Sequence, residues 1–231
     1  IFEFIEIFHP KIMETIIGIR CKDCVIIATD RVNAFSIIMV KNDMNKIYQL
    51  NDNLVMAVNG EPGDTVQFAE YISKNIQLYK MRHGYDLSPM ASTTYVQRNL
   101  ANYLRSRTPY HVNLMMAGYD TQMKKPHLSF IDYLATTVEV PFGAHGYGSF
   151  FTMGILDRVY KPDCTADDAM EMLKQCITEI QRRLVINQPV FQVCKVDVNG
   201  IEHLDDIVVN PDKVLNSELK LQKPTVQPMI H

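Results

Sequence analysis

Short runs of apolar and β-branched residues dominate the first part of the chain and return near its middle and its end. Runs of this kind, bounded by polar turn residues, predict β-strands. The predicted strands occupy residues 15–21, 24–30, 45–50, 53–59, 111–118, 127–133, 136–140, 190–197 and 201–209. Between the last two stands the dipeptide Asn199-Gly200, which predicts a type I′ hairpin turn.

Helices are predicted where apolar residues recur at spacings of three and four. The first helix follows Asp64, a predicted N-cap, and ends at Gly84. A second begins at Ser88-Pro89, a capping residue followed by proline at the first helical position. A short helix follows Gly148, and the longest begins at Thr165. The apolar stripe of this longest helix consists of Met170, Leu173, Ile177, Ile180 and Leu184.

The predicted elements follow one another as strands, two helices, strands, two helices and strands. Strands that come in hairpin-like runs favour antiparallel sheets. Runs such as Val25-Ile26-Ile27 and Leu114-Met115-Met116 are apolar on both faces, so each sheet must be covered on both sides. Two sheets packed on each other, each with a helix pair outside, satisfy this requirement. The predicted fold class is therefore α/β (α+β), a four-layer α/β/β/α sandwich of two antiparallel sheets.

One domain over residues 13–209 accounts for every predicted element. Residues 1–12 are predicted to be an N-terminal extension, either a pro-segment or an artefact, because Met13 opens the first well-patterned strand. Residues 210–231 lack apolar periodicity and contain three prolines, which predicts an extended C-terminal tail.

Composition narrows the classes of partner. The 231 residues are 47% hydrophobic and 21% charged with a net charge of −3, so nothing favours nucleic acid or an anionic membrane as a partner. No run of about 18 or more apolar residues predicts a membrane span. The cysteines number five, and an odd count favours reduced thiols in an intracellular compartment over a disulfide framework.

Two of these cysteines, Cys21 and Cys24, have the spacing of a redox or zinc pair. Lys22-Asp23 between them reads as a hairpin turn, whereas a thioredoxin-like pair would stand at a helix N-terminus. Zinc would need a second pair of ligands, and none occurs at suitable spacing. We therefore interpret the pair as flanking a turn, and we predict neither a metal site nor a cofactor.

The candidate chemistry lies at strand ends. Asp30 closes one predicted strand and Lys46 opens another, so the two could meet across the sheet. An acid beside a lysine can prime a nucleophile, but a partly buried ion pair is the more common use. Gly60 could present its backbone N–H to an oxyanion at the mouth of a helix. The motif Gly146-x-Gly148-Ser149 is more typical of a tight turn.

Several longer stretches carry a resemblance to a known family. They are "GEPGDTVQFAEYI", "NIQLYKMR", "LRSRTPYHVNL", "MAGYD", "AHGYG" and "ILDR". From Met13 to about Ile207 the chain resembles the β-type subunits of the proteasome, and among them the non-catalytic type at the fourth position of the β-ring. The resemblance implies the fold of the N-terminal-nucleophile hydrolases, in which a processed threonine at the start of the first strand attacks the peptide.

The resemblance also assigns residues. It implies that Asp30 and Lys46 correspond to the aspartate and lysine that support the nucleophile, Gly60 to the oxyanion glycine and Ser149 to a supporting serine. The nucleophile position falls on Glu14, or on Met13 if the strand start shifts by one residue, and neither side chain has an attacking hydroxyl.

Other supporting positions differ as well. Where active members have an aspartate and a serine after the last long helix, this chain has Leu184 and Asn187. Thr15 offers a hydroxyl next to the nucleophile position, but Glu14 replaces the glycine that precedes the processed bond in active members.

The resemblance therefore implies a non-catalytic structural subunit of the 20S core. Such a subunit would sit, in two copies, in a four-ring assembly of α- and β-type subunits in the cytoplasm and nucleus. One alternative is an active threonine endopeptidase subunit that uses Thr15 after propeptide removal. Another is a free-standing binding or thiol-dependent protein that uses Cys21 and Cys24.

Overall fold

The computed structural model describes residues 14–35 and 38–209. The predicted N-terminal extension (1–12) and C-terminal tail (210–231) lie outside the described residues. The strands are β1 (Thr15–Arg20), β2 (Val25–Asp30), β3 (Asn33–Phe35), β4 (Ile38–Lys41), β5 (Ile47–Asn51), β6 (Leu54–Gly60), β7 (Val112–Asp120), β8 (Lys125–Ile131), β9 (Thr137–Glu139), β10 (Phe142–Gly146), β11 (Val190–Asp197) and β12 (Gly200–Val208). The helices are α1 (Pro62–His83), α2 (Pro89–Leu104), α3 (Ser149–Val159) and α4 (Ala166–Arg183).

Two five-stranded sheets organise the described chain. One has the order β10-β1-β2-β11-β12 and the other β5-β6-β7-β8-β9, and a short β3-β4 hairpin stands apart from both. Neighbouring strands in both sheets pair antiparallel. Hairpin connections account for most of these pairings, because strands that are close in sequence and joined by tight turns pair in this direction.

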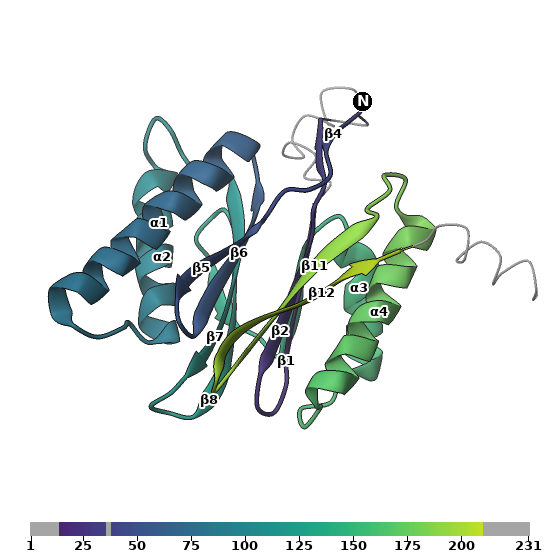
Figure 1. Ribbon diagram of the computed structural model, residues 1–231. Helices are drawn as coiled ribbons and strands as arrows, with labels where there is room; N and C mark the ends of the chain where they lie inside the picture. Colours follow the sequence, from purple (N-terminus) through teal and green to yellow (C-terminus); the bar gives the residue numbers. More distant parts are fainter. Residues whose placement is uncertain (1–13, 36–37, 210–231) are drawn as a thin grey trace, which may run out of the picture.

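The sheets face each other, and each carries a helix pair on its outer side (Figure 1). A central apolar layer includes Ile16 and Ile27 from one sheet and Val55 and Met115 from the other. Two outer layers lie beneath α3 and α4 on one side and beneath α1 and α2 on the other. The predicted four-layer α/β/β/α sandwich is confirmed.

The ends of α1 show one predicted feature and one error. The helix ends at Gly84, whose φ of 77° is left-handed and suits glycine. Its start differs from the prediction, because Glu61 is the N-cap, Pro62 is the first helical residue and Asp64 lies inside the first turn. The Asp64 carboxylate accepts a hydrogen bond of 2.9 Å from the backbone N–H of His111, a residue far along the chain. The Asp64 side chain therefore binds the distant His111 N–H instead of capping the helix.

The start of α4 forms a capping box. Thr165 Oγ1 accepts from the Asp168 N–H, and the Asp168 carboxylate accepts from the Thr165 N–H. Each residue thus satisfies a backbone N–H of the other at the N-terminus of the helix.

Replacing Thr165 by alanine removes half of this box, so Thr165→Ala is expected to lower the free energy of unfolding by about 1 kcal/mol. Thr178→Ala on the same helix is the matched control, because the Thr178 hydroxyl donates to the Lys174 carbonyl and is not part of the capping box. Urea unfolding of both variants measures the difference. Equal stability of the two would contradict a role for the capping box.

The hairpin between β11 and β12 also differs from the prediction. Asp197 pairs with Gly200, so the two-residue turn is Val198-Asn199 rather than Asn199-Gly200. Gly200 has a φ of 112°, whereas Asn199 is not among the described residues with positive φ. A type I′ turn needs positive φ at both central residues, so the predicted turn type is wrong.

Candidate functional site

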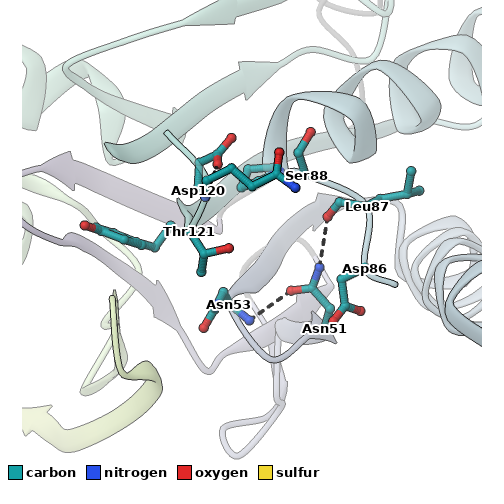
Figure 2. A pocket seen from close by; sticks show the side chains of 10 residues that line it. Asn51, Asn53, Asp86, Leu87, Ser88, Asp120 and Thr121 are labelled. Atoms are coloured by element: carbon teal, nitrogen blue, oxygen red, sulfur yellow. Dashed lines mark hydrogen bonds between the residues drawn. The ribbon is translucent and has the colours of Figure 1, made fainter. Parts of the chain in front are cut away.

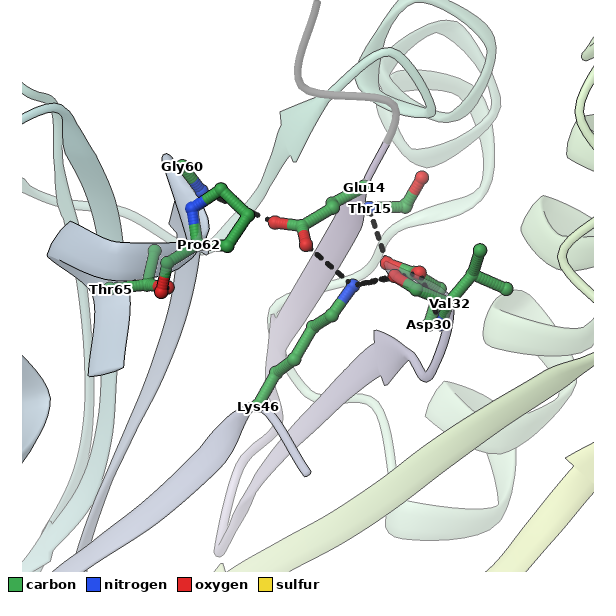
Figure 3. A network of polar contacts seen from close by, with 8 residues as sticks. All are labelled: Glu14, Thr15, Asp30, Val32, Lys46, Gly60, Pro62 and Thr65. Carbon is green, nitrogen blue, oxygen red and sulfur yellow. Dashed lines mark hydrogen bonds and ion pairs between the residues drawn. The ribbon is translucent and has the colours of Figure 1, made fainter. Parts of the chain in front are cut away.

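Asp30 and Lys46 meet, but between the two sheets rather than across one. Asp30 is the last residue of β2, and Lys46 immediately precedes β5 in the opposite sheet. The Lys46 ammonium lies 2.9 Å from Asp30 Oδ2, with the two side chains 3% and 0% exposed (Figure 3). A charge pair this deeply buried needs further hydrogen bonds on both partners.

Those further bonds are present on both sides. Lys46 also donates to the Val32 carbonyl at 2.6 Å. Asp30 accepts from two backbone N–H groups, those of Thr15 at 2.7 Å and Val32 at 2.9 Å. The pair is therefore anchored to β1 and to the chain just after β2, and its geometry is held by backbone as well as side chains.

Glu14 completes the network. One carboxylate oxygen lies 3.0 Å from Lys46 Nζ, and the other accepts from the Gly60 backbone N–H at 3.2 Å. Figure 3 shows the Glu14 side chain reaching between these two donors. Burial raises the pKa of the Glu14 carboxyl, the nearby charge of Asp30 adds to that effect, and the contacts with Lys46 and Gly60 oppose it.

Thr15 points to the opposite side of the first strand. Its side chain is fully buried against the turn before α3, so that a Cβ added at Gly148 would lie 2.4 Å from Thr15 Oγ1. Glu14 immediately precedes β1, and its side chain leaves the chain on a different side from that of Thr15 (Figure 3). The Thr15 hydroxyl has no hydrogen-bond partner among the described residues.

Ser149 lies near this region but outside the network. It begins α3, and its hydroxyl donates to the Gly146 carbonyl at 2.6 Å. The bonds of Glu14, Asp30 and Lys46 within the described chain are made without it. Leu184 caps the end of α4, and Asn187 is exposed in the following connection. The structure thus gathers Glu14, Asp30, Lys46 and Gly60 and places the remaining predicted positions apart from them.

Sequence reasoning missed two contributors to the site. The Val32 carbonyl carries no side-chain signal, because any residue could supply it. Gly146, predicted only as part of a turn, pairs with Thr15 and has a φ of 78°. A Cβ added there would lie 1.8 Å from the Glu14 carbonyl oxygen, so glycine is required for the two strands to approach. In the sequence, the two glycines of the Gly146-x-Gly148-Ser149 motif were the signal that could have indicated this close approach.

The thiol pair takes the predicted structural position. Cys21 and Cys24 flank the turn between β1 and β2, and the Cys21 N–H donates to the Cys24 carbonyl at 2.8 Å. Both are free thiols buried in the layer beneath α3 and α4. No described residues form a group of three or more side chains suited to a metal ion. None of the described helices combines the length and apolar character needed to cross a bilayer.

A polar hollow lies at the other end of β5 and β6, away from the network. Figure 2 shows its lining, which comes from the β5–β6 turn, the start of α2 and the end of β7. Asn51 organises it, because its amide donates to the Leu87 carbonyl at 3.3 Å and its side-chain oxygen accepts from the Asn53 N–H at 2.9 Å. The bond to Leu87 therefore ties the β5–β6 turn to the segment before α2, and the bond to Asn53 holds the turn itself.

Comparisons with known proteins identify the family of this chain. The proteasome subunit family matches residues 13–196. Proteasome subunit beta type-4 of Saccharomyces cerevisiae is 45% identical over 194 residues, which cover 84% of this chain and 98% of the relative. Proteasome subunit beta type-2-A of Arabidopsis thaliana is 42% identical over 188 residues, covering 81% and 91%. The chain therefore belongs to the proteasome subunit family, among its β-type subunits.

Proposed function

We propose that this chain is a non-catalytic structural subunit of the 20S proteasome core, where it lines the proteolytic chamber and contacts its ring neighbours. The observation that carries the proposal is the place of Glu14. Its carboxylate occupies the space between Lys46 and the Gly60 N–H, the two groups that would have to serve a nucleophile and an oxyanion. A carboxylate fixed there offers no hydroxyl for attack.

Thr15 does not rescue the reaction in this proposal. Its hydroxyl faces the turn before α3, on the side of β1 away from Lys46 and Gly60. Its backbone N–H donates a hydrogen bond to the Asp30 carboxylate at 2.7 Å. Cleavage between Glu14 and Thr15 would leave the hydroxyl on the wrong face, because strand alternation is set by the pairing of β1 with β2 and β10.

Family membership implies assembly with other proteasome subunits. We extend the proposal to two copies of this chain in a four-ring particle of α- and β-type subunits, located in the cytoplasm and nucleus. The buried ion network then has a structural role: it ties the start of β1 to both sheets at the mouth of the sandwich.

The test is covalent labelling of assembled core particles with an epoxyketone-type inhibitor, followed by intact-mass measurement of each subunit. The expected result is no inhibitor adduct on this chain, because the described partners of Lys46 Nζ and of the Gly60 N–H include no hydroxyl. Catalytic β-type subunits in the same particles serve as the internal positive control and gain the inhibitor mass. An adduct on Thr15, with a chain that begins at Thr15, would overturn the proposal in favour of an active threonine endopeptidase.

A further inference from the structure

The Lys46 ammonium has three N–H bonds, and three acceptors lie within reach of it in the described part of the chain. These are Glu14 Oε1 at 3.0 Å, Asp30 Oδ2 at 2.9 Å and the Val32 carbonyl at 2.6 Å. Two of the acceptors belong to the β2 end of the first sheet and hold the ammonium in place without Glu14. The third N–H is therefore directed at the Glu14 position by the rest of the fold.

The second donor is equally fixed. Gly60 closes β6 with a φ of 146°, and a Cβ added to it would lie 2.2 Å from the His111 carbonyl oxygen. The residue must therefore be glycine, and no side chain of its own can cover its N–H. That N–H donates to Glu14 Oε2 at 3.2 Å. Strand pairing of Gly60 with Val112 in β7 sets its direction.

Glu14 bridges these two donors with its two carboxylate oxygens. Both contacts are made by the carboxylate oxygens alone, so a small carboxylate that is not attached to the main chain could make both. Removing the Glu14 side chain would leave one ammonium N–H and one amide N–H aimed at a vacated, largely buried space. Buried donors without partners are costly, so the space favours an anion of this shape.

We propose that Lys46 and the Gly60 N–H form a binding site for a small carboxylate, and that Glu14 is its built-in occupant. The inference rests on the proposed function, since an active chain would need this space open for substrate. It assigns Glu14 a specific part in that function: the side chain closes the site against carboxylates and peptide carbonyl oxygens.

The test uses the full chain carrying Glu14→Ala, with acetate as the probe. Urea unfolding is followed in increasing sodium acetate and, separately, in sodium chloride at the same ionic strength. The expected result is a saturable, acetate-specific stabilisation of Glu14→Ala, with the folding equilibrium constant rising about tenfold when acetate reaches ten times its Kd. The wild-type chain is expected to respond equally to the two salts, because its site is filled.

A matched variant and a local readout sharpen the result. Glu14→Gln keeps the side-chain volume, so it is expected to show no acetate-specific response. The chain has ten glycines, so ¹⁵N-glycine labelling resolves the Gly60 amide, which should shift with acetate in Glu14→Ala only. If Glu14→Ala folds in acetate but not in chloride, that rescue is the same positive result.

Equal responses of Glu14→Ala to acetate and chloride, or an unmoved Gly60 amide, would overturn the inference. So would a variant that folds in neither salt while Glu14→Gln folds, since acetate would then not replace the carboxylate. None of these outcomes bears on the proposed function, which is decided by inhibitor adducts on the assembled particle. An adduct on this chain would reject that function whatever acetate does.

Discussion

Lys46→Met is expected to lower the free energy of unfolding by about 3–5 kcal/mol, the cost of breaking a buried ion pair from one side. The substitution keeps most of the side-chain volume, so the loss comes from charge and hydrogen bonding. It leaves the carboxylates of Asp30 and Glu14, 0% and 15% exposed, facing each other without a cation between them. Urea unfolding of the full chain at neutral pH measures the difference.

The matched control is Lys80→Met. Lys80 also contacts two carboxylates, those of Asp52 at 3.0 Å and Asp86 at 2.9 Å, but its side chain is 46% exposed. Water solvates the carboxylates that this variant leaves behind, so little change in stability is expected. A similar loss of unfolding free energy in both variants would show that the burial of Lys46 does not increase the cost of removing its charge.

The stability deficit of Lys46→Met should shrink as the pH falls. Burial already raises the pKa of Glu14, and loss of Lys46 removes the largest effect that lowers it. A carboxyl group whose pKa is higher in the folded than in the unfolded chain binds its proton more tightly when folded. The variant therefore regains stability as the pH falls through the raised pKa toward the ordinary value of 4.5. A deficit that grows over this range would contradict the assignment to Glu14.

Gly146→Ala is the second substitution expected to have a large effect, a loss of about 2–5 kcal/mol from left-handed strain and close packing together. The φ of 78° disfavours any side chain, and the new Cβ would lie 1.8 Å from the Glu14 carbonyl oxygen. A backbone atom cannot rotate away as a side-chain end can, so β10 and β1 must separate. The separation would also displace Glu14 from Lys46.

Gly154→Ala in α3 is the control for this variant. An added Cβ at Gly154 meets nothing within 4 Å, and alanine favours a helix over glycine. The control is therefore expected to gain about 0.5–1 kcal/mol. Urea unfolding of the two variants should move in opposite directions. A neutral Gly146→Ala would show that the strand pair can relax around the extra methyl group.

The regular elements were predictable because their signals are local. The Thr165 cap and the apolar residues that recur every three or four positions from Met170 to Leu184 together indicate α4. The strands β3, β4 and β10 were not predicted, and β10 contains two glycines, a residue that is depleted in strands. Asp64 was misassigned because its partner, the His111 N–H, stands 47 residues away. In the case of Asp64, a distant contact therefore overrides the local pattern.

At the site, the sequence could name residues but not their geometry. Asp30, Lys46 and Gly60 were identified from strand ends and a glycine, and Glu14 from the resemblance to a family. That Asp30 and Lys46 belong to opposite sheets follows only from the packing of those sheets. The same packing brings Gly60 to one carboxylate oxygen of Glu14 and Lys46 to the other.

By itself, the sequence determined the order of the elements, the two-sided burial of the strands and the absence of a hydroxyl at position 14. These properties depend on side-chain type and short-range periodicity. Only the tertiary structure decided which side of the chain at the start of β1 faces Lys46. As a result, the Glu14 side chain fills the space between Lys46 and the Gly60 N–H, and the Thr15 side chain packs against Gly148 instead. The physical reason is that strand alternation sets two opposite faces, and only the packing of one sheet on another chooses between them.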